Sequence, residues 1–256
     1  LFWLIPSSLS FLAINTLIGG RRLSVMSSNG VFTTIINLKK GKYEWSFSFS
    51  AIDGSLHEVK LTDGNVAYII VSKVKGEIKD GSLYISRIDY VDEICEDCQS
   101  EEEMKKLEYE EAKKESGVDI LFLDRKISLD EFYKDNVIAI VKDPSKRVEV
   151  EAQTPWLVPI KEEKIKSAYF KLFPFSWVFL VETTVNKDWE EILSILYLLG
   201  KEPIPEALGY NYPLYLADKV AKFYRDKKKK ELDFVTSKFP QRYRQFRSII
   251  EKNRRK

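Results

Sequence analysis

Carboxylates at the ends of two predicted strands are the residues of this sequence best placed to do chemistry. Asp53 follows segment 43–52, whose alternation of apolar and polar residues predicts a strand with one buried face. Asp124 follows the apolar segment 118–123, which predicts a short buried strand. If these strands are neighbours, the acids converge, and their hard oxygens suit Mg2+ or Mn2+, ions that activate water for phosphoryl displacement. The alternative is that each aspartate simply ends a strand and begins a turn.

Further acids lie on predicted helices. In the helix that begins near Ser100, Glu108 and Glu111 fall beside an apolar stripe. A carboxylate there needs a partner or a metal, unless only its stem borders the core. The spacing leaves the choice between the two glutamates open. In the helix that Pro213 opens, Asp218 interrupts another apolar stripe.

A sheet and several helices are needed to position these acids. Before residue 92 the chain alternates between strand-like runs and turn signals, which predicts a meander of antiparallel strands. Shorter apolar runs and helices follow, so the predicted fold class is α/β. The predicted strands are 43–52, 57–62, 66–74, 82–89, 118–123, 137–142, 167–173 and 176–183. The predicted helices begin at Ser100 as N-cap, span 187–199 with Asn186 as N-cap, and begin at Pro213.

The composition is that of a folded globular chain. Of 256 residues, 44% are apolar and 13% aromatic, which excludes a disordered chain, a collagen-like fibre and a polytopic membrane protein. The net charge is only +2. That sum is a cancellation, because fifteen basic and four acidic residues after residue 218 give a tail of +11 on a body of −9. The near-neutral total therefore does not count against nucleic acid as a partner.

The ends of the chain and its cysteines are harder to interpret. Residues 1–20 carry no charge, which is compatible with a fragment or alternative start before Met26, with an apolar packing helix, or with a weak anchor. We divide the chain into an apolar segment 1–25, a main domain 26–225 and a basic helical tail 226–256. Cys95 and Cys98 supply half a zinc site at most. A transferable disulfide is the alternative, but no β-α-β redox context surrounds the pair, and we interpret the two cysteines as an incidental exposed pair.

Five short motifs, taken in order, resemble the NurA family of archaeal and bacterial DNA nucleases. Together they cover roughly residues 45–225. The motifs are Ala51-Ile52-Asp53-Gly54-Ser55, Ile120-Leu121-Phe122-Leu123-Asp124, the strand 137–142 ending in Lys142, the paired strands of 168–182 ending in Glu182, and the segment 209–218 beginning Gly209-Tyr210 and ending Ala217-Asp218.

The resemblance implies an RNase H-like fold, with a mixed, largely antiparallel central sheet flanked by helices. It implies a cytoplasmic, Mn2+-dependent (or Mg2+-dependent) nuclease that acts on single- and double-stranded DNA ends. It further implies a homodimer that partners a HerA-type hexameric translocase in DNA-end resection for recombinational repair. Asp53, Asp124 and Glu108 match the family's metal-binding acids, Tyr210 matches an active-site tyrosine, and Lys142 is a candidate DNA contact.

Two departures from the family pattern bear on activity. Arg125 and Lys126 stand where the family commonly has Gly-Ser after the aspartate, and Asp218 replaces a histidine. An aspartate can ligate a hard cation, so Asp218 remains a candidate catalytic and metal-binding residue, but it does not imitate a neutral imidazole. The alternative function is therefore a weakly active or inactive NurA-like subunit that binds DNA or docks a translocase.

The basic tail is the second predicted DNA-binding element. Pro240 can open a helix in which aromatic and apolar residues recur at three- and four-residue steps. Arg242, Arg244 and Arg247 surround that stripe and could neutralise phosphates along a DNA channel. The alternatives are docking on an acidic partner, contact with a membrane surface, or a solvated terminal helix. We expect no stable membrane association.

Overall fold

The computed structural model describes residues 23–26, 32–38, 46–61, 64–142, 150 and 152–238. The apolar segment 1–20, the helix predicted after Pro240, and Arg242, Arg244 and Arg247 lie outside the described residues. Within the described part, no helix combines the length and apolar character needed to cross a membrane.

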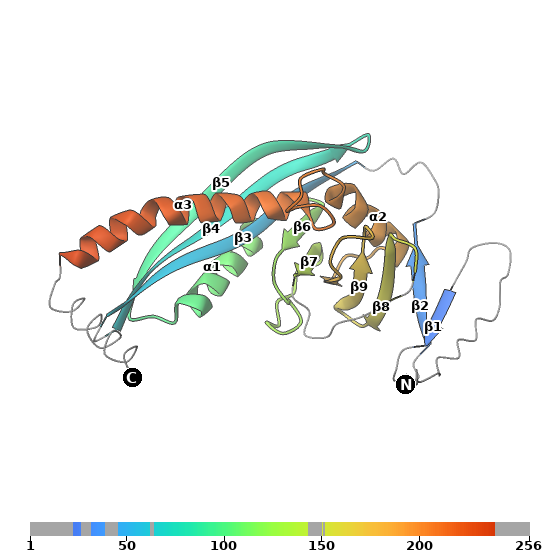
Figure 1. Cartoon of the computed structure of the whole chain (residues 1–256), viewed down its shortest axis with the longest axis horizontal. Coiled ribbons are helices and arrows are strands. Elements are labelled where there is room, and N and C mark those ends of the chain that lie inside the picture. Colours follow the sequence, from blue (N-terminus) through green and yellow to red (C-terminus); the bar gives the residue numbers. More distant parts are fainter. Residues whose placement is uncertain are drawn as a thin grey trace, which may run out of the picture.

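A ten-stranded sheet forms the framework, in the order β1-β2-β8-β9-β10-β7-β6-β3-β4-β5 (Figure 1). Among the described strands, β3 pairs with β6 and β6 with β7 in parallel, and the other pairs are antiparallel. The predicted class, a mixed and largely antiparallel sheet flanked by helices, is confirmed. The strands are β1 (Leu23–Met26), β2 (Phe32–Asn37), β3 (Phe47–Leu61), β4 (Gly64–Lys79), β5 (Ser82–Glu96), β6 (Ile120–Leu123), β7 (Val137–Val141), β8 (Trp156–Glu162), β9 (Lys166–Lys171) and β10 (Phe179–Thr183). The helices are α1 (Ser100–Lys114), α2 (Trp189–Gly200) and α3 (Tyr212–Ser237).

Strand β3 differs from its prediction in a way that matters for the site. It runs without a break from Phe47 to Leu61, whereas the sequence predicted an end at residue 52 and a new strand at 57. The ladder with β4 is continuous through this region and pairs Asp53 with Ser72. Asp53-Gly54-Ser55 is therefore strand, and the alternative that Asp53 begins a turn is wrong. Strands β1, β2 and β8 were not predicted at all.

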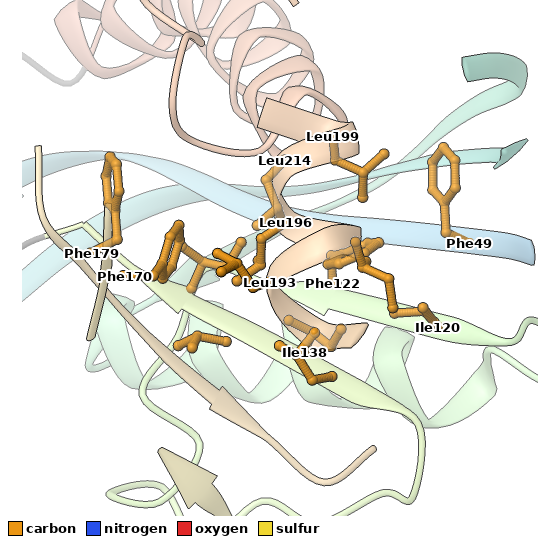
Figure 2. Packing of buried hydrophobic residues seen from close by; sticks show 14 of the residues in the cluster. Phe49, Ile120, Phe122, Ile138, Phe170, Phe179, Leu193, Leu196, Leu199 and Leu214 are labelled. Carbon is orange, nitrogen blue, oxygen red and sulfur yellow. The ribbon is translucent and has the colours of Figure 1, made fainter. Parts of the chain in front are cut away.

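The two faces of the sheet carry different helices. Alternate residues of β3, β6 and β7 form one core with α2 and α3 (Figure 2). The residues between them, such as Ile52 and Leu123, form a second core with α1 on the opposite face. The first core includes Phe49, Phe122, Ile138, Phe170, Leu193, Leu196 and Leu214. Because side chains on a strand alternate between faces, these two cores fix which way each site residue points.

Two helix starts differ from the prediction. The N-cap of α1 is Gln99, and the Ser100 hydroxyl instead donates to Glu58 Oε1 at 3.1 Å. The N-cap of α2 is Asp188 rather than Asn186, and it forms a reciprocal capping box with Glu191. Gln99 makes no side-chain cap hydrogen bond at α1, and Ser100 is engaged by Glu58, whereas at α2 the local capping box favours Asp188.

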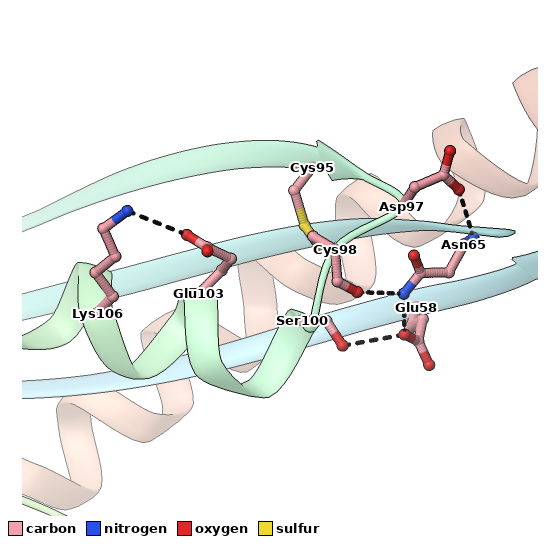
Figure 3. Close-up of a disulfide and its surroundings, with 8 residues drawn as sticks. All are labelled: Glu58, Asn65, Cys95, Asp97, Cys98, Ser100, Glu103 and Lys106. Carbon is pink, nitrogen blue, oxygen red and sulfur yellow. Dashed lines mark hydrogen bonds and ion pairs between the residues drawn. A yellow bond between two sulfur atoms is a disulfide. The ribbon is translucent and has the colours of Figure 1, made fainter. Parts of the chain in front are cut away.

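Cys95 and Cys98 are joined by a disulfide, with 6.0 Å between their Cα atoms. It lies between the end of β5 and the start of α1 (Figure 3). Asn65 Nδ2 donates to the carbonyl oxygen of Cys98 at 2.8 Å, which ties this connection to β4. The interpretation of the two cysteines as an incidental exposed pair is therefore wrong.

Candidate active site

Parallel pairing of β3 and β6 places two acids side by side. Ile52 lies opposite Leu123 in the ladder, so Asp53 and Asp124 follow at the same level. Ala51 and Phe122, two residues earlier, both belong to the α2 and α3 core. By alternation Asp53 and Asp124 face the same side, toward α3. The sequence-predicted convergence of these two acids is what the structure shows.

Strand β7 adds a cation on the same side. Lys142 follows β7 directly, in phase with the core residues Ile138 and Ile140. Its ammonium Nζ lies 2.5 Å from Asp124 Oδ2. Burial lowers the pKa of Lys142, but the adjacent Asp124 carboxylate outweighs this effect and raises it above its ordinary value. Lys142 therefore stays charged at neutral pH.

Asp53 is the exceptional acid of the group. Its side chain is buried, at 8% exposure, and within the described residues it forms no ion pair. The backbone N–H of Gly54 donates to its Oδ1 at 2.9 Å. Burial, and then the negative charges of Asp124 and Glu108, raise the pKa of Asp53 well above its ordinary value. A carboxylate in this position is stabilised by a proton or by a cation.

Helix α1 delivers Glu108 to the same place from the opposite face. Glu108 is buried, and Arg125 binds it through two hydrogen bonds, including Nη2 to Oε1 at 3.0 Å. Burial raises the pKa of Glu108, and the guanidinium of Arg125 opposes this shift only in part. A Cβ on Gly54 would lie 2.3 Å from Glu108 Oε1, so any larger residue here would displace the glutamate from its position against β3.

Glu111 does not belong to this group. Its carboxylate pairs with Lys73 Nζ and Lys114 Nζ, each at 2.6 Å. The structure thus separates the two glutamates that the sequence could not distinguish. Arg125, which the sequence offered only as a departure from the family pattern, is the partner of Glu108.

Helix α3 brings Asp218 to the cluster. The Ser72 hydroxyl donates to the carbonyl oxygen of Ala217 at 2.6 Å and fixes this turn of α3 on β4. Asp218 pairs with Lys222 one turn later, at 2.8 Å, and its charge contributes to the raised pKa of Asp53. Its side chain is 16% exposed, so one side of the cluster is open to solvent.

Tyr210 forms the wall between Lys142 and the core. Its ring centroid lies 4.7 Å from Lys142 Nζ, and its side chain is buried. Burial, and then the charges of Asp124 and Asp53, raise the pKa of Tyr210 well above its ordinary value, so its hydroxyl stays protonated. That hydroxyl is buried beside Asp124, in a geometry that falls short of a regular hydrogen bond.

The sequence patterns did not predict three hydrogen bonds that support the site. Ser55 Oγ accepts from Arg225 Nη1 at 2.9 Å, which ties the motif after Asp53 to α3. Buried Glu182 accepts from the backbone N–H and the hydroxyl of Ser128, at 2.9 and 2.6 Å, and holds the loop that follows Asp124. For Glu182 the only signal was a glutamate at the end of a buried strand, and nothing indicated the partners.

The donor set suits a hard divalent cation, with one restriction. Within the described residues no three acids stand close enough to enclose an ion, and Asp124, Glu108 and Asp218 each pair with a cationic side chain. The buried carboxylate of Asp53 is what fits a metal, since hard oxygen ligands favour Mg2+ and Mn2+. Glu108 is the least available ligand, because Arg125 occupies both of its oxygens.

The topology and the acids define a class of protein. The order β5-β4-β3-β6-β7, with β3–β5 antiparallel and β3, β6 and β7 parallel, is that of an RNase H-like domain. The NurA domain family matches residues 47–162 and 143–223, and the chain belongs to that family. No curated protein matches the sequence.

Three solved structures are similar to this chain. The crystal structure of the NurA nuclease from Sulfolobus solfataricus has a TM-score of 0.55 at 17% identity, over 78% of this chain and 87% of that one. Endonuclease V from Bacillus subtilis has a TM-score of 0.47 at 15% identity, over 72% and 83%. Endonuclease V from Ciona intestinalis, in complex with a 23mer DNA, has a TM-score of 0.44 at 10% identity, over 75% and 91%. The first likeness shows the fold.

Proposed function

We propose that this chain is a divalent-metal-dependent deoxyribonuclease that hydrolyses phosphodiester bonds at the ends of single- and double-stranded DNA. The observation that carries the proposal is Asp53, a buried carboxylate without an ion pair in the described part of the chain, at the same level as Asp124. Asp53 and Asp124 would hold Mn2+ or Mg2+, and Asp218 would join them by exchanging Lys222 for the ion. When bound, such an ion activates a water and neutralises charge on the phosphate.

The chain's own residues supply the remaining interactions. The side chain of Lys142 is 41% exposed although its amino group contacts Asp124, so it can reach a phosphate at the mouth of the site. The protonated hydroxyl of Tyr210 is buried beside Asp124, so Tyr210 lines the base of the site and orients the groups around it. Arg125 holds Glu108 in place at the base of the cluster.

We further propose the biological setting that family membership suggests. In it the chain acts as a cytoplasmic homodimer, with a HerA-type hexameric translocase, in DNA-end resection for recombinational repair. The dimer is tested by the mass of the purified protein in solution. The translocase partnership is tested by co-purification with a hexameric ATPase of that type.

Incubation with labelled linear DNA tests the nuclease. We expect degradation of single- and double-stranded substrates with Mn2+ or Mg2+, and none in EDTA. The Asp124→Asn variant should lose degradation while still binding DNA, because it keeps the shape of the site and removes a ligand charge. Degradation that persists in EDTA would contradict the metal requirement.

A second candidate function has specific support. Arg125 engages both oxygens of Glu108, and Asp218 stands where the family has a histidine, so the ligand set is weaker than the family pattern. The alternative is a DNA-binding or translocase-docking subunit with little activity. Salt-dependent DNA retention without degradation in any divalent metal would favour that alternative.

A further inference from the structure

The turn between β9 and β10 carries two strongly exposed aromatic side chains. Phe175 is 73% exposed and Trp177 is 81% exposed, more than any other aromatic residue in the described part of the chain. Exposed aromatic side chains this close together in sequence are typical of a binding surface.

This turn is structured. The Phe175 ring stacks on Phe173, with centroids 5.9 Å apart and planes within 8°, and Phe173 in turn packs on Tyr197 of α2 at 5.6 Å. The backbone N–H of Ser176 donates to the carbonyl oxygen of Phe173 at 3.1 Å, and the Ser176 hydroxyl donates to the same oxygen at 3.0 Å. Phe175 is thus presented in a fixed orientation.

The turn also packs directly beside the candidate active site. A Cβ on Gly209 would lie 2.4 Å from Ser176 Cβ, so the turn contacts the residue before Tyr210. The Phe179 ring lies 5.4 Å from the Tyr210 ring. In the ladder Leu180 pairs with Val141, which puts Phe179 level with Lys142 at the same edge of the sheet.

The start of β10 joins this turn to the core next to the acids. Val178 packs with Trp156 and Val158 on one face, and Phe179 packs in the α2 and α3 core on the other. Trp177 lies two residues before β10, in the turn that packs against Gly209, and its ring is 81% exposed.

We propose that Phe175 and Trp177 form a stacking platform for the unpaired bases of a DNA strand whose backbone is held at Lys142. This inference rests on the proposed function and adds a preference for single-stranded ends. Aromatic rings stack on any base, so such a platform is tolerant of sequence. Bases inside a duplex are already stacked on their neighbours and present no free face, so only an unpaired end engages both rings.

DNA binding by variants in a cleavage-impaired background tests the platform. The full chain carries Asp53→Asn, and dissociation constants are measured by fluorescence anisotropy for oligo-dT and for a blunt-ended duplex of equal length. Trp177→Ala should weaken oligo-dT binding by about 5- to 150-fold, the range that loss of one base–aromatic stack produces. The duplex constant should change by less than about twofold, and Trp177→Phe should restore most of the oligo-dT affinity.

Tyr84→Ala is the matched control, because Tyr84 is 53% exposed on the edge strand β5 and lies outside both the turn and α3. It should leave both constants unchanged. Equal weakening of oligo-dT and duplex binding, or none in Trp177→Ala, overturns the platform. A Trp177→Ala variant that loses self-association but keeps oligo-dT affinity identifies the turn as a protein interface and also overturns it. If the unmodified chain cleaves DNA but Trp177→Ala binds normally, only the platform fails; if it neither binds nor cleaves DNA, the proposed function fails as well.

Discussion

Two clusters of buried acids lie on opposite faces of the same strands, and they differ in how their charges are matched. On the α1 face, Glu111 and Glu115 pair with Lys73 and Lys75 of β4 at distances from 2.6 to 3.5 Å. On the α3 face, Asp53 has no cation of its own among the described residues. The first cluster fastens a helix to a sheet. The second leaves one buried carboxyl group without a matching cation, which is typical of a binding site.

The pKa shifts have opposite signs in the two clusters. Burial raises the pKa of Glu111, but hydrogen bonds from Lys114 and Lys73 outweigh it and hold that pKa below its ordinary value. Burial and neighbouring acids act together on Asp53 and raise its pKa. Burial alone therefore does not identify a functional acid; the lack of a matching cation does.

The largest expected effect is on catalysis. Asp53→Asn should lower nuclease activity by about 100-fold or more, because it removes the unmatched ligand charge. Glu111→Gln, the matched change on the other face, should lower activity less than about threefold once the folded fraction is equal. Initial rates on labelled DNA measure both. Equal losses in the two variants would remove the distinction between the clusters.

Arg125→Ala should have the largest effect on stability. It leaves Glu108 buried without a cation, and breaking such a pair destabilises a protein by about 3 kcal/mol. Lys114→Ala, which removes a pair whose lysine is 64% exposed, should change the unfolding free energy by at most about 0.5–1 kcal/mol. Urea unfolding compares them. An unchanged unfolding free energy in the Arg125→Ala variant would show that Glu108 finds another partner.

Gly54→Ala should have an intermediate effect. The new methyl would meet Glu108 Oε1 at 2.3 Å and force the glutamate away from Asp53. Overpacking of this kind destabilises by about 1–3 kcal/mol. The same substitution in a Glu108→Ala background should be tolerated better, and thermal denaturation of the four proteins isolates the coupling. Equal effects of Gly54→Ala in both backgrounds would contradict the contact.

The smallest expected effect is on the pH dependence of the melting temperature, measured in EDTA. Asp53 favours its protonated form in the folded state, so its contribution to stability falls as pH rises above its unfolded value of about 3.9. Asp53→Asn should therefore melt about 2–4 °C above the wild type at pH 8, with the difference vanishing near pH 4. Glu111 stabilises above about pH 4.3, so Glu111→Gln should melt below the wild type at pH 8 and approach it in acid. If both variants changed the melting temperature at pH 8 in the same direction, the proposed difference between the two clusters would be wrong.

The sequence predicted the convergence of Asp53 and Asp124 because both follow apolar runs that form core strands. It could not choose between Glu108 and Glu111, since both flank the same helical stripe and their partners lie on β4 and after β6. It also misplaced the end of β3, because Asp-Gly-Ser has turn composition while here it is held in the ladder by β4. Local propensity carries no information about such long-range contacts.

The unbroken course of α3 has a consequence for spacing. Asp218 and Lys228 lie on the same helix, ten residues apart, and therefore about 15 Å apart along its axis. Ser72 fastens the helix to the sheet at Ala217, next to Asp218. Arg225 fastens it again between Asp218 and Lys228, through its hydrogen bond to Ser55. The helix thus holds Asp218 and Lys228 at a fixed separation. A strand with its reacting phosphate at Asp218, rising about 3.4 Å per nucleotide as in B-form DNA, would bring a phosphate roughly four nucleotides away level with Lys228.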